Sequence, residues 1–297
     1  MTKRLAGVIA AIATAVDERS EPDLARSVAF AEYLLANGCD GLNVLGTTGE
    51  ATSFSLTQRE RVMSAYKGAG LTMNRLMVGT GAAALADAIA LTQHAAGLGF
   101  GGALVLPPFY YKNVPDDGLM AYVAGIIAAT SDQPIPIYLY NFPAMSGIVW
   151  RPDLVRKLRA AHGSRLAGLK DSSGDMAYAR EMATIADDFD VFPSNEAVLL
   201  EAREGKFAGC ISATANVNSD LCGLAWRNGD KAAHETAVAI RKLFDGRPLV
   251  PGIKALIAHT QADPGWARTM PPLAPVSAQD QTAILSGHDG LRARRVA

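Results

Sequence analysis

The chain has 297 residues, of which 49% are hydrophobic and 19% charged, which suits one large α/β domain with a substantial core. Its 28 basic and 29 acidic side chains leave a net charge of -1, so no general field attracts nucleic acid or an anionic membrane. We therefore expect neither as a partner, and the charge of a substrate must be met locally by a few groups.

The cysteines and the first apolar stretch indicate in which cellular compartment the protein is expected. Cys39, Cys210 and Cys222 lie far apart with no Cys-x-x-Cys, which argues against a disulfide framework and predicts a reducing, cytoplasmic location. The apolar stretch 5–16 resembles a short secretion signal, but it leads directly into Asp17-Glu18-Arg19 and a helix pattern. We interpret it as a buried strand, and we expect no transmembrane helix because no apolar run reaches about 18 residues.

Eight short apolar runs with β character alternate with helical patterns along the chain. The predicted strands are 8–15, 41–45, 75–79, 102–106, 135–140, 166–170, 190–193 and 209–212. The predicted helices between them are 24–36, 58–68, 84–96, 117–130, 152–161, 176–187 and 196–204. Asn37-Gly38, Gly97, Gly163 and Gly205 are the expected helix stops.

Eight βα units within one chain of this length favour a (β/α)8 barrel, the TIM-barrel fold. An open doubly wound sheet is the alternative, but no Gly-x-Gly-x-x-Gly follows the first strand. Further helical patterns cover 221–228, 230–243, 253–259 and 278–285. We predict a barrel over residues 1–220, a helical extension packed on it over 221–286, and a disordered tail over 287–297.

Active sites of such barrels lie where the strands end, so the residues at those ends indicate the chemistry. The second, fourth, fifth, sixth and eighth predicted strands end in notable polar or aromatic segments. These are 46–50 (GTTGE), 107–111 (PPFYY), Tyr140-Asn141, Lys170-Asp171, and Ser212 with Thr214. The sequence thus predicts an amine, phenols, paired threonines and backbone amides around one cavity.

Lys170 ends the apolar strand Leu166-Ala167-Gly168-Leu169. A lysine that points into a barrel loses hydration, which disfavours its charged form, and a neutral amine attacks ketones. The iminium that results is an electron sink for the neighbouring carbon. The alternative is a solvated lysine on a rim loop; we favour the catalytic interpretation because of the neighbouring motifs.

The segment Gly46-Thr47-Thr48-Gly49 follows the second predicted strand. Two threonines between glycines can present hydroxyl and backbone N–H groups as a small anion site, and a carboxylate fits it without an arginine. By itself the motif is also compatible with an ordinary turn in which Thr52 or Ser55 caps the next helix.

Tyrosines also lie at the predicted strand ends, near Lys170 and the threonine segment. Tyr140 can relay protons near Lys170 if a neighbour such as Thr47 orders its hydroxyl. Tyr110 is a second candidate for this role. We interpret Tyr138, two residues before Tyr140 on the same strand face, and Tyr111 as amphipathic rim aromatics.

Metal and cofactor motifs are not found in the sequence. The five histidines are scattered, without His-x-His, His-Glu-x-x-His or a carboxylate cluster at metal spacing. No P-loop and no Gly-x-Ser-x-Gly elbow is present either. We expect neither a metal nor a cofactor.

In this order and spacing, the motifs resemble the dihydrodipicolinate synthase / N-acetylneuraminate lyase family of class I, pyruvate-dependent aldolases. The resemblance covers about residues 5–260. It rests on five segments: 46–50 (GTTGE), 108–111 (PFYY), 140–143 (YNFP), 168–171 (GLKD) and 211–217 (ISATANV).

The resemblance implies that Lys170 forms the Schiff base and that Tyr140 shuttles protons near the imine. Thr47 and Thr48, with Gly46 beside them, correspond to the residues that hold the carboxylate of pyruvate. Ile211 corresponds to a residue near the bound keto acid. These roles assign catalysis to Lys170, Tyr140, Thr47 and Tyr110.

The resemblance also implies an assembly. In the family the tyrosine that Tyr110 matches reaches into the neighbouring subunit's site. A homotetramer built as a dimer of dimers is therefore expected, with the tight dimer as the active unit.

Two departures from the family concern the second substrate. Dihydrodipicolinate synthases carry an arginine for the carboxylate of aspartate semialdehyde where this chain has Met145, which offers no charge-assisted bond. Sialic-acid lyases carry a Gly-Tyr-Asp-Glu segment where this chain has Ser194-Asn195-Glu196. A shorter polyhydroxy or neutral aldehyde fits better, with Ser194 and Met145 as substrate contacts.

The leading hypothesis is a Schiff-base carbon–carbon lyase, an aldolase that cleaves or forms a 2-keto-3-deoxy sugar acid from pyruvate and an aldehyde. A 2-keto-3-deoxy-acid dehydratase and a true dihydrodipicolinate synthase remain alternatives within the same chemistry. A barrel that binds a keto acid without catalysis is the alternative from a different class.

Overall fold

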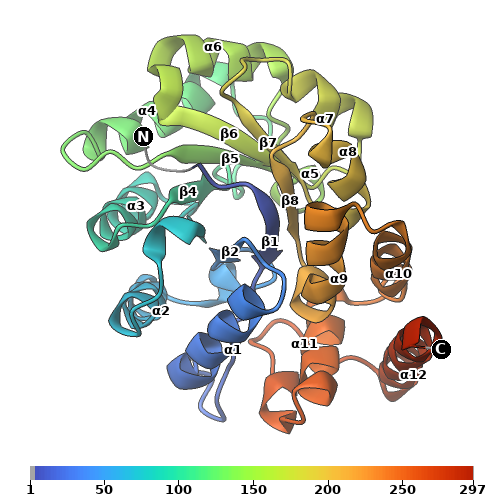
Figure 1. Cartoon of the computed structure of the whole chain (residues 1–297). Helices are drawn as coiled ribbons and strands as arrows, with labels where there is room; N and C mark the ends of the chain where they lie inside the picture. The colour runs from blue at the N-terminus through green and yellow to red at the C-terminus, as the bar shows by residue number, and fades with distance from the viewer. Residues whose placement is uncertain (1–3, 297) are drawn as a thin grey trace.

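The computed structural model describes residues 4–296, and its centre is a barrel of eight parallel strands (Figure 1). The strands are β1 Gly7–Ala11, β2 Gly41–Val44, β3 Leu76–Gly79, β4 Gly102–Val105, β5 Ile137–Asn141, β6 Leu166–Asp171, β7 Asp190–Pro193 and β8 Gly209–Ser212. They neighbour one another in the order β7-β6-β5-β4-β3-β2-β1-β8. The N–H of Ala208 bonds the carbonyl of Val191 at 3.0 Å, which brings β7 to β8. The predicted (β/α)8 barrel is confirmed.

Helices surround the strands as an outer ring, and α9 to α12 gather on one side of it (Figure 1). The helices are α1 Leu24–Ala36, α2 Leu56–Gly68, α3 Leu85–Leu98, α4 Asp116–Ala129, α5 Pro143–Ser146, α6 Pro152–His162, α7 Met176–Met182, α8 Leu199–Arg203, α9 Ala215–Asn228, α10 Lys231–Lys242, α11 Leu249–Thr260 and α12 Ala278–Val296. Between residues 4 and 296, none of them has the length and apolar character needed to span a membrane.

Local signals explain several helix ends. Ser55 caps α2 in a capping box with Gln58, so the capping role expected of Thr52 or Ser55 belongs to Ser55. The predicted stop at Gly97 is wrong, because α3 continues to Leu98 and ends against Gly99. Gly99 has φ +83°, a left-handed conformation that glycine adopts without steric cost.

The end of the chain differs from its prediction. The tail from Gly287 is helical as far as Val296 instead of disordered, while Ala297 lies outside the described residues. Arg292 on α12 pairs with Asp220 at 2.7 Å and bonds the carbonyl of Val217 at 2.9 Å. Leu291 of the same helix packs against the core, and together with these contacts to α9 it orders a segment whose composition alone suggested fraying.

Two apolar layers form the core. Side chains that face the strands' inner side fill the barrel, among them Ile9, Leu104, Phe192 and Ile211. Alternate strand residues such as Leu42 and Val44 pack outward against the helices. Each fully buried aliphatic side chain of this kind contributes about 1.5–3 kcal/mol of transfer free energy. β1 lies within the first apolar stretch and all of its residues are buried, so the buried strand expected there is present.

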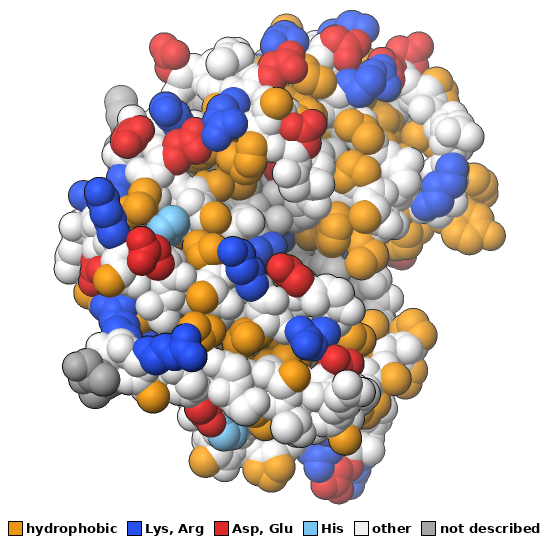
Figure 2. Space-filling model, turned by 90° about the vertical axis from the view of Figure 1, so that its right-hand side faces the viewer, with side chains coloured by type: hydrophobic (Ala, Val, Ile, Leu, Met, Phe, Trp, Pro, Cys, Tyr) orange, Lys and Arg blue, Asp and Glu red, His pale blue; other side chains and the backbone are white. Residues whose placement is uncertain are grey.

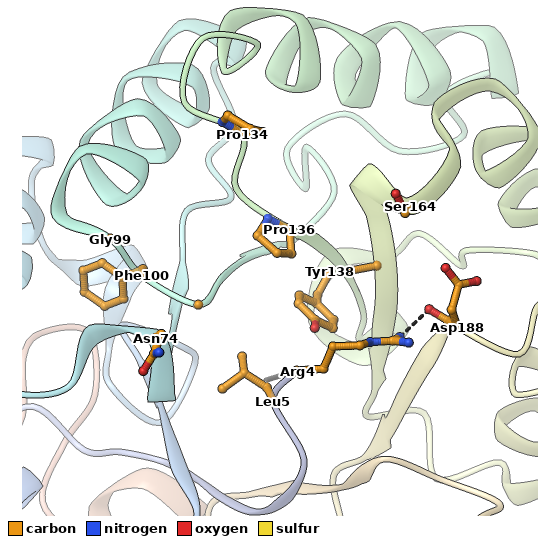
Figure 3. Close-up of a pocket in the computed structure, with 12 residues that line it drawn as sticks. Arg4, Leu5, Asn74, Gly99, Phe100, Pro134, Pro136, Tyr138, Ser164 and Asp188 are labelled. Carbon is orange, nitrogen blue, oxygen red and sulfur yellow. Dashed lines mark hydrogen bonds between the residues drawn. The ribbon is translucent and has the colours of Figure 1, made fainter. Parts of the chain in front are cut away.

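A cavity of about 330 Å³ opens at the end of the barrel where the strands begin (Figure 3). Its wall includes Leu5, Asn74, Pro136, Ser164 and Asp188, which directly precede strands or lie just ahead of them. Because barrel active sites lie at the opposite end, this cavity is not the candidate site.

Tyr138 lies at this strand-start end of the barrel. Its hydroxyl donates to Asp190 at 3.3 Å, and Arg4 donates to the same carboxylate at 2.9 Å. Burial raises the pKa of Asp190 above its ordinary value despite these two bonds. Tyr138 is therefore an interior side chain and not the rim aromatic that its sequence suggested.

Charged side chains of both signs are interspersed on the face that Figure 2 presents. The chain also has ion pairs in which both side chains are exposed, such as Arg156 with Glu181 at 3.0 Å. Such pairs contribute little stability because water screens them. The balanced composition thus produces a mixed surface on this face.

Candidate active site

Lys170 and Tyr140 face each other inside the strand-end half of the barrel. They are register partners on β6 and β5, and both side chains are almost fully buried. The Lys170 amine donates to the Tyr140 hydroxyl at 3.3 Å and lies 4.3 Å from the centre of its ring. The amine is thus held in one place, enclosed by protein and within proton-transfer distance of a phenol.

Thr47 continues this chain of polar groups. Its hydroxyl lies 3.2 Å from the Tyr140 hydroxyl, and either of the two can donate. Lys170, Tyr140 and Thr47 therefore form a hydrogen-bonded series drawn from β6, β5 and the turn after β2. A series of this kind can pass a proton between the amine and a reactant beside it.

The turn that carries Thr47 and Thr48 has an unusual backbone. Leu45 before it and Glu50 at its end both adopt left-handed conformations, with φ +53° and φ +55°. Such conformations cost about 1–3 kcal/mol for residues other than glycine, and they concentrate at functional sites. The carbonyl of Leu45 comes so close to Gly79 that a Cβ there would lie 2.1 Å from it. Gly79 is thus required by the approach of this turn.

A buried ion pair supports the turn from behind. The Glu50 carboxylate accepts from the Lys254 ammonium of α11 and from the backbone N–H of Met270 at 2.6 Å. Lys254 also donates to the carbonyl of Thr14 at 3.0 Å. Burial lowers the pKa of Lys254, and the nearby Glu50 charge opposes that shift. The C-terminal helices therefore hold the threonine turn in position.

Replacing Lys254 with methionine is expected to lower the free energy of unfolding by about 3–5 kcal/mol, because Glu50 stays buried without its counter-charge. Urea denaturation measures the loss. Arg61→Met is the control: it breaks an ion pair with Glu21 whose side chains are 52% and 41% exposed, and should cost less than about 1 kcal/mol. Equal small losses in both variants would contradict the supporting role.

A second pair of polar residues locks β5 to β6 on their helix-facing side. The Asn141 amide donates to Asp171 at 2.7 Å and accepts from the backbone N–H of Trp150 at 3.1 Å. Ser173 donates to the same carboxylate at 2.9 Å. Burial raises the pKa of Asp171, while the bonds from Asn141 and Ser173 act in the opposite direction. The two residues directly after Tyr140 and Lys170 thus fix the strand ends that carry them.

The end of β8 contributes differently from its prediction. Ile211 faces the barrel interior, as a contact with a keto acid requires. The hydroxyls of Ser212 and Thr214, however, donate to the fully buried carboxylate of Glu196, with the Ser212 bond at 2.7 Å. Asn218 donates to the same carboxylate at 2.8 Å, which leaves this cluster engaged in its own contacts.

The remaining predicted residues lie at different depths. Gly46 and Thr48 are buried in the threonine turn, and Ser194 is half-buried, with its N–H bonded to the carbonyl of Asp171 at 2.8 Å. Tyr110 is 75% exposed and Met145 is 61% exposed. Within one chain, Tyr110 therefore does not join the Lys170–Tyr140–Thr47 series.

Sequence reasoning missed the groups that act through distant contacts. Glu50 was visible as the end of the threonine motif, but its partner Lys254 is 204 positions away. Asn43, a polar residue within an apolar strand, was a signal that could have been noticed. In the structure it is fully buried, and its amide has no hydrogen-bond partner within residues 4–296.

Comparisons with known proteins identify the family of this chain. The model of the Dihydrodipicolinate synthetase family matches residues 4–287. A relative described as an uncharacterized DapA-like lyase from Chloroflexus aurantiacus is 30% identical over 272 residues, which cover 89% of each chain.

Solved structures give the same result. Dihydrodipicolinate synthase from Agrobacterium tumefaciens superposes with a TM-score of 0.90 at 28% identity, over 96% of this chain and 99% of its own. YagE, a prophage protein of Escherichia coli K12 solved in complex with pyruvate, gives 0.87 at 25% identity, over 97% and 98%. The chain therefore belongs to the dihydrodipicolinate synthetase family and is a Schiff-base-forming lyase.

Proposed function

We propose that this enzyme is an aldolase that joins pyruvate to an aldehyde, or cleaves the 2-keto-3-deoxy sugar acid so formed, through a Schiff base on Lys170. The observation that carries the proposal is the buried Lys170 amine, 3.3 Å from the Tyr140 hydroxyl. The pyruvate complex of the Escherichia coli relative supports the choice of keto acid.

The chemistry follows from these positions. The lone pair of the Lys170 amine adds to the keto carbon, and loss of water from the carbinolamine gives an iminium. Tyr140 supplies the proton that the departing hydroxyl needs, because its own hydroxyl lies beside the amine. The backbone amides and hydroxyls of Thr47 and Thr48 hold the carboxylate.

In the cleavage direction, Tyr140 accepts the proton of the hydroxyl on the carbon that becomes the aldehyde. The carbon–carbon bond breaks, its electrons pass into the iminium, and an enamine remains. Protonation of the enamine and addition of water then return pyruvate and the free amine. Neither a metal nor a cofactor enters this scheme, since the iminium is itself the electron sink.

The preference for a sugar acid rests on Met145. It belongs to the short helix α5, directly after β5, where a dihydrodipicolinate synthase places its carboxylate-binding arginine. A thioether adds no charge-assisted bond there, so a neutral polyhydroxy aldehyde is the better partner. Ser194, beside the end of β7, is proposed as a second contact for this substrate.

We also propose that the active unit is a dimer within a homotetramer in the cytoplasm. Tyr110 and Tyr111 are both more than 70% exposed, and their rings contact each other edge to face, 5.3 Å apart. Large exposed aromatics of this kind are typical of interfaces. In such a dimer, Tyr110 would approach the site of the other subunit.

A substrate panel tests the choice of aldehyde. Released pyruvate is measured with several 2-keto-3-deoxy sugar acids, and condensation is measured with pyruvate and aspartate semialdehyde. We expect sugar-acid cleavage to have the higher kcat/KM. A higher kcat/KM with aspartate semialdehyde would identify a synthase instead, and loss of water without cleavage would identify a dehydratase.

Met145→Arg is expected to shift this preference. A charge-assisted bond to the carboxylate of aspartate semialdehyde should raise kcat/KM for that aldehyde by about 10- to 100-fold. Met145→Leu, of similar size and without charge, is the control and should leave the preference unchanged. An equal response to both variants would show that Met145 does not face the aldehyde.

A further inference from the structure

Asn43 occupies an interior position on β2. Its strand neighbours Leu42 and Val44 pack outward against the helices, so alternation along the strand directs Asn43 into the barrel. Its register partners Ala11 on β1 and Met77 on β3 both belong to the apolar interior cluster. The side chain is fully buried, with 0% exposure.

Asn43 lies at the same level along the barrel as Tyr140 and Lys170. Asn43 is the last interior-facing residue of β2 before the threonine turn begins, as Tyr140 is on β5 and Lys170 is on β6. The amide oxygen lies only 2.7 Å from the point where a Cβ on Gly46 would stand. The amide therefore lies directly beneath the turn that presents Thr47 and Thr48.

The Asn43 amide is unfavourable for the stability of the fold. Neither its nitrogen nor its oxygen has a hydrogen-bond partner among residues 4–296. A buried amide without partners costs free energy, and most such groups in folded proteins are paired. A leucine has the same branching and the same number of side-chain heavy atoms, and it carries no polar atom that needs a partner. A residue that is unfavourable for the fold yet placed beside the reacting groups is typical of binding sites.

We propose that the Asn43 amide is a substrate-binding group that donates a hydrogen bond to the keto acid's carboxylate from below, opposite the threonine turn. The inference rests on the proposed Schiff-base function. An uncharged donor suits this position. Thr47 and Thr48 already donate hydrogen bonds to the carboxylate from above, so a cationic side chain is not needed beside it. An amide also adds no second amine that could compete with Lys170 for the keto carbon.

The test compares stability with pyruvate binding in Asn43→Leu. The melting temperature is measured without ligand, and Lys170 labelling by borohydride is measured against pyruvate concentration. We expect the variant to melt no lower than the wild type, since it removes a buried polar group for which residues 4–296 supply no hydrogen-bond partner. Its half-saturating pyruvate concentration should rise about tenfold or more, as expected for loss of one hydrogen bond to a charged group.

Two further variants sharpen the result. Met77→Leu changes a neighbouring interior side chain without changing polarity and should leave half-saturation unchanged. Asn43→Asp keeps the shape but sets a carboxylate against a carboxylate, so half-saturation should rise further than with leucine. This second variant decides the matter if the leucine variant does not fold.

Unchanged half-saturation in Asn43→Leu, with Lys170 fully labelled, would overturn the inference and leave the proposed function intact. A lower melting temperature with unchanged half-saturation would also overturn it, by showing that the amide serves the fold. If pyruvate does not label Lys170 in the wild type, the proposed function fails and this inference fails with it.

Discussion

Lys170→Met abolishes labelling by pyruvate and borohydride and lowers kcat by at least about 10⁴-fold, as expected when the nucleophile of a covalent mechanism is removed. The side chain is 3% exposed and donates to Tyr140, so the substitution removes the amine that is enclosed beside the proposed proton-transfer group. Methionine preserves the length of the chain and avoids a cavity in the barrel. Peptide mass spectrometry of the reduced adduct and a pyruvate-release assay provide the two measurements.

The control is Lys157→Met, which removes an exposed lysine on α6 and should leave both readouts at wild-type values. A labelled adduct on another lysine in the folded Lys170 variant would refute the assignment. Pyruvate binding that persists without any activity in the wild type would instead support the barrel as a non-catalytic keto-acid binder.

Tyr140→Phe is expected to lower kcat by about 10²- to 10⁴-fold, the usual effect of losing a general acid or base. The hydroxyl that is removed lies 3.3 Å from the Lys170 amine and 3.2 Å from the Thr47 hydroxyl. The ring stays, so the amine keeps its aromatic neighbour. Labelling of Lys170 should still reach completion but more slowly, which a time course of borohydride trapping measures.

Tyr138→Phe is the matched control, because Tyr138 is on the same strand and face, two residues nearer the strand start. Its hydroxyl bonds Asp190 and not the proposed reacting groups. We expect kcat to remain within about twofold of the wild type and stability to fall by about 1 kcal/mol. If both phenylalanine variants lower kcat equally, the Tyr140 hydroxyl is not the general acid or base of the reaction.

The strands and the positions of Lys170 and Tyr140 were predictable from local pattern. Apolar runs of four to six residues between helical patterns mark buried parallel strands, and a polar residue that ends such a run must lie at the strand-end face of the barrel. The sequence therefore predicted that Lys170, Tyr140 and Thr47 would meet. Tyr110 illustrates the limit, since one chain leaves it 75% exposed and its proposed role needs a second subunit.

Local pattern also determined most helices, but not where the chain's end would go. The tail from residue 287 is polar, basic and contains glycines, which is why disorder was predicted there; its glycines also weaken helical propensity. Packing of Leu291 against the core, with the Arg292–Asp220 pair beside it, offsets that weakness. The pair joins residues 72 positions apart, so no local window contains it.

The sequence by itself thus determined the alternation of strands and helices, the barrel, and which reactive side chains end the strands, because these follow from periodicity over a few residues. Only the tertiary structure decided that Lys254 pairs with Glu50 behind the threonine turn and that Ser212 and Thr214 donate hydrogen bonds to Glu196. It also decided that residues 4–296 supply no hydrogen-bond partner for the Asn43 amide. The physical reason is that hydrogen-bond partnership and burial depend on how distant segments pack, and local propensity does not encode that packing.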